Sequence, residues 1–164
     1  MSKTQCSTCR EPKASLQCKV CSTPQCKKCV QVVGDERLTY LDDKVPQLLE
    51  GGGVFCNSCF ESDIAPTLNE YDEVMERAKQ VFVFFEKQSK ETRLIRRSEK
   101  KFNVGGDDQT DIVMKLAFLA AKSGFNAVVD IAVKGEKRRD GSYKLMTWTG
   151  TGTAAHVDAA RHNR

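Results

Sequence analysis

Eight cysteines in the first sixty residues constrain this 164-residue chain more than any other feature. Two residues between cysteines let a tight turn, or knuckle, point both sulfurs at one ion, and Zn²⁺ takes four such ligands in a tetrahedron. Eight thiols therefore predict two Zn²⁺ ions in closed structural sites. No cysteine stands outside the four Cys-x-x-Cys pairs, which are Cys6/Cys9, Cys18/Cys21, Cys26/Cys29 and Cys56/Cys59.

Redox dithiols and disulfides are the alternatives to zinc. A single Cys-x-x-Cys near a βαβ pattern is typical of a redox site. Four pairs together, with polar knuckle residues such as Ser7-Thr8 and Asn57-Ser58, argue against that reading. Disulfides need an oxidising compartment, and the start Met1-Ser2-Lys3-Thr4 has no apolar run for export. Free thiols therefore lead us to expect a reducing, cytoplasmic location.

The spacing of the pairs bears on which of them share an ion. The gaps between pairs are 8, 4 and 26 residues. A turn as short as residues 22–25 can place the second and third pairs on opposite sides of a hairpin, so that alternate pairs meet in a cross-brace. Sequential pairing stays open, because spacing does not determine connectivity. The cross-brace assigns Cys6, Cys9, Cys26 and Cys29 to site 1, and Cys18, Cys21, Cys56 and Cys59 to site 2.

Four such pairs with four residues between the second and third resemble the FYVE-type zinc finger, within the wider RING/PHD cross-brace group, over about residues 4–62. That family reads phosphatidylinositol 3-phosphate with a basic, histidine-containing stretch around the third cysteine. Here residues 14–19 are Ala-Ser-Leu-Gln-Cys-Lys, and only Lys19 fits a basic position. Phosphoinositide binding is therefore not expected. A RING normally has a histidine among its ligands, which makes ubiquitin-ligase function a minor alternative.

The whole chain predicts an α+β fold: a small two-zinc cross-brace finger, then a helix, then a small helix-plus-antiparallel-sheet domain. So short a finger buries little core, and metal must stabilise it. Pro66 is expected to stop any helical turn after Cys59, and Thr67 to cap the next helix. The expected parts are the finger at 1–65, a helix and basic connector at 66–104, an α+β segment at 105–158 and a tail at 159–164.

Apolar residues recur at helical spacing from Tyr71 through Val74 and Ala78, which predicts a helix over about 68–88. The run Val-Phe-Val-Phe-Phe at 81–85 is apolar all round and is also compatible with a strand. Residues 89–103 are left open among strand, helix and linker.

A second helix is predicted after Asp107-Asp108, with Gly124 as its C-cap. Two β-rich stretches follow, at 126–133 and 143–154, joined by an Asp140-Gly141 turn. Residues 108–157 resemble the C-terminal half of the YbjQ-like domain, a family of small α+β proteins described as heavy-metal-binding and reported to form rings. The resemblance implies self-association through this segment. It is carried by Ala121, Gly124, Asn126-Ala127-Val128-Val129, Gly141-Ser142 and Gly152-Thr153-Ala154.

Charge gives little indication of a partner. The formal net charge is +4 with neutral thiols, and eight thiolates with two Zn²⁺ ions bring the loaded protein near zero. No apolar run approaches the ~18–20 residues of a membrane span. A solvated face is the preferred reading of the basic residues, and nucleic-acid contact is the alternative. Its candidate residues are Lys27, Lys28, Arg93, Arg96 and Arg97.

These features predict a zinc-binding, non-catalytic interaction or scaffold module with a C-terminal association domain. Closed four-cysteine shells leave no coordination position for chemistry, and no nucleophile–base or carboxylate pair stands out, so no enzyme activity is expected. The expected partner is a protein, with homo-oligomerisation through the C-terminal domain. The alternatives are a nucleic-acid-binding zinc-finger protein and a RING-like ubiquitin-ligase module.

Overall fold

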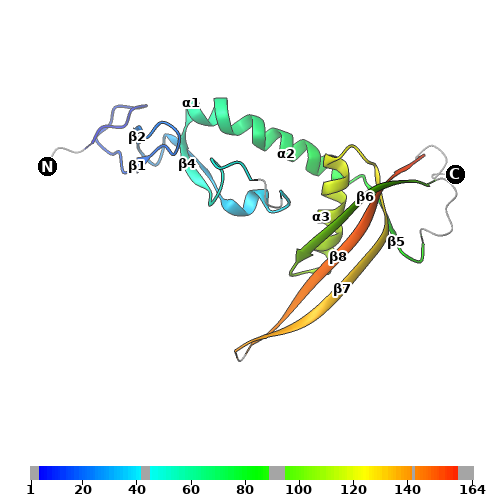
Figure 1. Cartoon of the computed structure of the whole chain (residues 1–164). Helices are drawn as coiled ribbons and strands as arrows, with labels where there is room; N and C mark the ends of the chain where they lie inside the picture. The colour runs from blue at the N-terminus through cyan, green and yellow to red at the C-terminus, as the bar shows by residue number, and fades with distance from the viewer. Residues whose placement is uncertain (1–3, 42–44, 89–94, 142, 159–164) are drawn as a thin grey trace. The chain divides into compact units, whose positions relative to one another are not determined.

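The computed structural model describes residues 4–41, 45–88, 95–141 and 143–158. The chain divides into two compact units, Met1–Asp72 and Glu73–Arg164. Helices and sheets are both present, which confirms an α+β protein (Figure 1). The two units are described in turn.

Short antiparallel ladders connect the knuckles of the first unit. β1 (Leu16–Gln17) pairs with β2 (Pro24–Gln25), and the second knuckle is the turn between them. β3 (Val30–Val33) leaves the third knuckle and pairs with β4 (Gly53–Cys56), which enters the fourth. A 3₁₀ turn, η1 (Asp35–Leu38), follows β3. These ladders hold knuckles that are distant in sequence close together.

The chain is helical from the fourth knuckle onward. α1 (Asn57–Cys59) passes through a π-helical turn, η2 (Phe60–Ile64), into α2 (Ala65–Ala78). Pro66 lies inside α2, so the prediction that it ends the turn after Cys59 was wrong. The wider π turn just before it, in which Ala65 N–H donates to Phe60 O, accommodates a residue that lacks its own N–H.

The predicted helix over 68–88 is too long. α2 ends at Ala78, and β5 (Phe82–Phe85) runs parallel to β7 (Ala127–Asp140). The strand reading of residues 81–85 is therefore correct, because a run of valine and phenylalanine suits a pleated surface. Within the predicted helix, Tyr71, Val74 and Ala78 are buried as expected.

The second unit contains a mixed four-stranded sheet in the order β5-β7-β8-β6, with β6 at Ile95–Gly106 and β8 at Tyr143–Val157. Only β5 is parallel to its neighbour, so the sheet departs from the purely antiparallel one expected. Residues 66–104, expected as a helix and basic connector, contain most of α2, all of β5 and most of β6. Residues 89–94 and the tail at 159–164 lie outside the described residues.

α3 (Gln109–Lys122) covers one face of this sheet (Figure 1). Both of its predicted ends are confirmed: Asp108 accepts from Thr110 N at 2.9 Å, and Gly124 has a φ of +82°. The helix buries its apolar stripe against the sheet, with Trp148 packed at the margin of the core. The core residues are Phe102, Val104, Ile112, Leu116, Ala120, Val128, Ile131 and Ala154.

Two glycines of β8 allow this close packing. A Cβ on Gly150 would lie 2.1 Å from Cγ2 of Ile112, and one on Gly152 would lie 2.6 Å from Cγ1 of Val128. Neither position has room for a methyl group: at Gly150 the side chain of Ile112 in α3 packs directly on the backbone of β8, and at Gly152 the space is taken by Val128 of β7.

Gly150→Ala should destabilise the second unit by about 1–3 kcal/mol, the usual cost of overpacking a core. Gly105→Ala is the matched control, because the nearest atom to a Cβ there is 3.9 Å away. Urea unfolding followed by the fluorescence of Trp148, the single tryptophan, measures both variants. Equal stability of the two would contradict the packing described.

Candidate metal centres

The eight thiols gather into two groups of four in the alternating arrangement. Site 1 contains Cys6, Cys9, Cys26 and Cys29, and site 2 contains Cys18, Cys21, Cys56 and Cys59; within each group the sulfur atoms lie within 4.8 Å of one another. The Cys9–Cys26 and Cys21–Cys56 sulfur pairs are each 3.8 Å apart. A tetrahedron with Zn–S bonds of about 2.3 Å has edges of about 3.8 Å. The groups therefore fit the two predicted Zn²⁺ ions.

Both sites are built on the same backbone plan. Cys26 N–H points at Cys6 Sγ at 3.3 Å, and Cys56 N–H points at Cys18 Sγ at 3.4 Å. The residue after each of the first two knuckles has a positive φ, +60° at Arg10 and +57° at Ser22. This repetition shows that each knuckle is shaped by its backbone, with N–H groups directed at sulfurs that carry negative charge when a metal is bound.

A buried glutamine that no sequence pattern had indicated lies between the two sites. Gln25 is 2% exposed. Its Oε1 accepts from Thr8 Oγ1 at 2.8 Å and lies 3.4 Å from Cys6 Sγ, while its Nε2 donates to Thr23 Oγ1 at 3.3 Å. That hydroxyl in turn lies 3.0 Å from Cys21 Sγ. A hydrogen-bonded path therefore runs from Thr8 of the first knuckle through Gln25 and Thr23 to Cys21, a ligand of site 2, the kind of outer-shell support that orients metal ligands.

Lys19 ties the long loop between the third and fourth pairs to the second knuckle. Its Nζ donates to Glu50 O at 2.7 Å and Gly52 O at 2.8 Å. The side chain crosses β4 at Gly53, where a Cβ would lie 2.8 Å from Cδ of the lysine. The one basic residue shared with the FYVE stretch is therefore bonded to backbone within its own finger.

The thiols of each group differ sharply in acidity when no metal is bound. The N–H of Cys9 and further backbone donors lower the pKa of Cys6 to about 6, and the Thr23 hydroxyl does the same for Cys21. Hydrogen bonding to Cys26 raises the pKa of Cys29 to about 12, and hydrogen bonding to Cys56 raises that of Cys59 to about 12. One thiolate forms readily in each group while another thiol keeps its proton, because like charges so close repel. A bound divalent cation offsets the repulsion between thiolates, so that all four thiols of a group can lose their protons.

The basic residues predicted to contact nucleic acid are divided between the two units. Lys27 and Lys28 are exposed at the third knuckle in the first unit. Arg96 and Arg97 are exposed neighbours on β6 and so point to opposite faces. Arg97 is paired with Asp130 at 3.1 Å. Arg93 lies outside the described residues.

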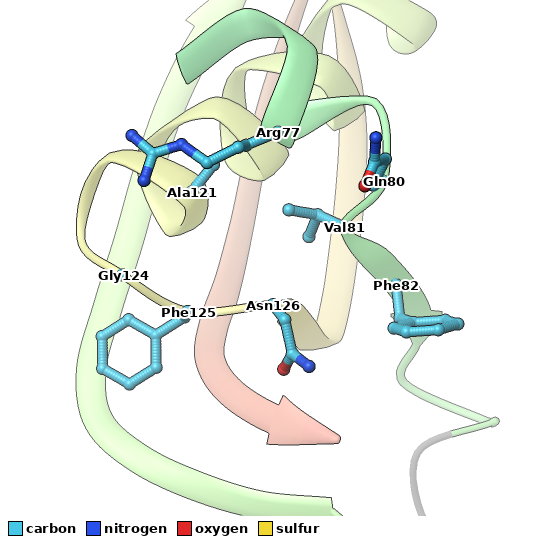
Figure 2. Close-up of a pocket in the computed structure, with 8 residues that line it drawn as sticks. All are labelled: Arg77, Gln80, Val81, Phe82, Ala121, Gly124, Phe125 and Asn126. Atoms are coloured by element: carbon cyan, nitrogen blue, oxygen red, sulfur yellow. The ribbon is translucent and has the colours of Figure 1, made fainter. Parts of the chain in front are cut away.

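The second unit has a surface hollow of about 500 Å³ (Figure 2). Its lining comes from the end of α2, the start of β5, and the end of α3 with the segment that leads into β7. Arg77 is the one charged side chain among these residues, and Asn126 is held by two hydrogen bonds to the backbone of Val157. The lining residues are Arg77, Gln80, Val81, Phe82, Ala121, Gly124, Phe125 and Asn126.

Comparison of the chain with protein-family models, curated proteins and solved structures finds no match. Within the described part of the chain, no helix has both the length and the apolar character needed to cross a membrane. The functional argument therefore proceeds from the metal centres.

Lys19→Met should loosen site 2 while leaving site 1 intact. It removes two charge-assisted hydrogen bonds to the loop that carries the fourth knuckle, and we expect a cost of about 1–3 kcal/mol. Zinc transfer to a colorimetric chelator should then show one of the two ions leaving at least about tenfold faster. Lys13→Met is the control, because the ion pair of that lysine among the described residues is with Glu11 at the surface. Unchanged zinc transfer from Lys19→Met would show that the lysine does not support the site.

Proposed function

We propose that this protein is a zinc-stabilised interaction module that performs no catalysis, with a C-terminal unit that mediates self-association. One observation carries the proposal: each group supplies all four ligands of a tetrahedral ion from cysteine side chains. A shell closed by protein leaves no position for the water or substrate that a catalytic zinc site needs.

The metals are proposed to stabilise a protein-binding surface. Binding of a structural zinc contributes about 10–16 kcal/mol in small zinc domains, far more than so short a finger can gain from its core. On the surface of the finger, Val32 of β3 is 72% exposed and Leu48 is 39% exposed. An exposed valine on the β3–β4 ladder and an exposed leucine in the loop before β4 suit contact with a protein partner. A reducing cytoplasm is the compartment that keeps such thiolates available for zinc.

The hydrogen bonds of Lys19 support a role other than lipid recognition. In the resemblance to FYVE-type fingers, this is the only basic position retained, and its ammonium group already has two carbonyl partners. The proposal therefore keeps the cross-brace architecture of that group without its phosphoinositide ligand.

The proposed association surface is β5, one edge of the sheet in the second unit. Its sequence, Phe-Val-Phe-Phe, contains no charge, and Val83 and Phe85 are 37% and 38% exposed. The opposite edge, β6, carries several exposed charged residues, which discourage edge-to-edge pairing. A second copy pairing along β5 would cover both exposed side chains, in line with the self-association implied by the YbjQ-like resemblance.

Cobalt substitution tests whether the two metal shells are closed. The account expects two Co²⁺ ions per chain, an intense thiolate-to-cobalt charge-transfer band and a tetrahedral spectrum that does not change when azide or imidazole is added. Ser58→Ala, which alters a knuckle without touching a ligand, should behave like the unmodified protein. Cys26→Ser should lose the site 1 ion. A spectrum that changes when azide or imidazole is added would show a metal with a free coordination position and would contradict the proposal that the protein performs no catalysis.

Sedimentation equilibrium tests the association surface. The unmodified protein should form a dimer, and Val83→Lys with Phe85→Lys should shift it to monomer by placing charges on the paired edge. Val32→Lys, at the exposed position on β3, is the control that leaves the dimer intact. A monomeric unmodified protein, or a dimer unaffected by the β5 variant, would rule out this surface.

A further inference from the structure

The hollow beside the end of α3 has the size and lining of a small-molecule site (Figure 2). Its volume of about 500 Å³ falls within the range of about 300–1,000 Å³ that is usual for ligand pockets. Val81, Phe82, Ala121 and Phe125 supply an apolar lining, as such pockets generally have. All of the lining residues belong to the second unit. The hollow is therefore a candidate binding site within one packed unit.

Contacts with buried side chains hold the apolar walls in place. Val81 and Phe125 pack against the hydrophobic core of the unit, and Ala121 is 3% exposed. The ring of Phe125 also contacts the ring of His156, with 4.8 Å between their centroids. Phe82 packs against a second buried cluster in the sheet. Because these side chains have neighbours behind them, the hollow keeps its shape without a ligand, and binding needs little ordering of the protein.

Much of the polar lining is already hydrogen-bonded within the protein. Phe82 N–H donates to Asn126 O at 2.9 Å, and Phe125 N–H donates to Ala120 O at 2.9 Å. The side-chain amide of Asn126 donates to Val157 O at 2.8 Å and accepts from Val157 N–H at 2.9 Å. These groups close the hollow structurally and leave ligand recognition to other side chains.

Two polar side chains of the lining are available to a ligand. Arg77, in the last turn of α2, and Gln80, just after it, are exposed, and neither side chain has a hydrogen-bond or ion-pair partner among the described residues. By contrast, Lys79 lies between them in sequence and pairs with Glu76. In Figure 2, Arg77 lies on the same side of the hollow as Phe125, and Gln80 lies on the other. The hollow thus combines apolar walls with a single uncompensated positive charge.

We propose that this hollow binds a small organic acid, with its carboxylate on the guanidinium of Arg77 and a planar apolar body against Val81 and Phe125. The guanidinium fork matches a carboxylate with two parallel hydrogen bonds, and an aromatic wall favours a flat apolar partner. One cation balances one negative charge, so a phosphate dianion would bring a second charge that no lining residue meets. This inference goes beyond the zinc-scaffold proposal and does not depend on it.

A carboxylate is also present at the C-terminus of a peptide, but the hollow suits a free acid better. A bound peptide would bury backbone N–H and C=O groups that need partners. The N–H groups of Phe82 and Phe125 and the carbonyl of Asn126 already have theirs within the protein. A free acid with an apolar body has no such requirement, so its carboxylate is the one polar group that the site must satisfy.

Nuclear magnetic resonance titration of the full, isotope-labelled and zinc-loaded chain with naphthoate tests the proposal. Naphthoate should shift the amide signals of residues 77–82 and 121–126 saturably, with a Kd of about 1 mM or tighter for an acid of this size. Naphthamide has the same shape without the charge and should bind about tenfold more weakly or worse. Acetate, which has the charge without the apolar body, should cause no saturable shift.

Substitution of the cation separates recognition of charge from general stickiness. Arg77→Gln should weaken naphthoate binding by about tenfold or more and leave naphthamide binding nearly unchanged. Lys122→Gln is the matched control, because Lys122 is exposed at the end of α3 and does not line the hollow; it should keep the affinity for naphthoate. Zinc content and circular dichroism establish that both variants are folded.

Several outcomes would overturn the proposal. They are the absence of saturable shifts with naphthoate, shifts confined to other residues, equal affinity for naphthoate and naphthamide, and equal losses in Arg77→Gln and Lys122→Gln. Equal or tighter binding of inorganic phosphate would show a general anion site, and equal or tighter binding of a short peptide that ends in phenylalanine would show a peptide site; either result contradicts a site for a free organic acid.

Discussion

Coordination of zinc by alternating cysteine pairs is the constraint on which the first unit depends. Site 1 joins the knuckle at Cys6 to the one at Cys26, and site 2 joins the knuckle at Cys18 to the one at Cys56. Each closure costs chain entropy, which grows only slowly with loop length, so two strong coordination sites can hold a unit whose strands are two to four residues long. The path through Thr8, Gln25 and Thr23 joins the first knuckle to a ligand of site 2 in one hydrogen-bonded framework.

The second unit is stabilised by a packed hydrophobic core. α3 packs on β8 at Gly150, and the core between them contains aliphatic and aromatic side chains without a buried charge. This conventional core supports a hairpin that extends beyond it. The two units are therefore held together in different ways, by metal ions in the first and by a packed core in the second.

Sequence was informative where a residue's chemistry acts over a short range. Cys-x-x-Cys pairs specify a ligand set almost alone, and Asp108 and Gly124 mark helix ends because their effects are local. Sequence patterns were misleading where contacts with distant parts of the chain determine the local structure. The helical spacing around Tyr71 continued into a run that pairs with a distant strand, and Pro66 was accommodated by a π turn. The roles of Lys19 and Gln25 could not be foreseen, since they depend on carbonyls and sulfurs that only the folded chain brings together.

The most direct test of the account is the connectivity of the two metal ions. With zinc replaced by a spin-active cadmium isotope, proton–cadmium correlation spectra report which cysteine β-protons couple to each ion. The account predicts two cadmium signals, one coupled to Cys6, Cys9, Cys26 and Cys29 and the other to Cys18, Cys21, Cys56 and Cys59. A signal coupled to the first two pairs together would show sequential pairing and contradict the cross-brace.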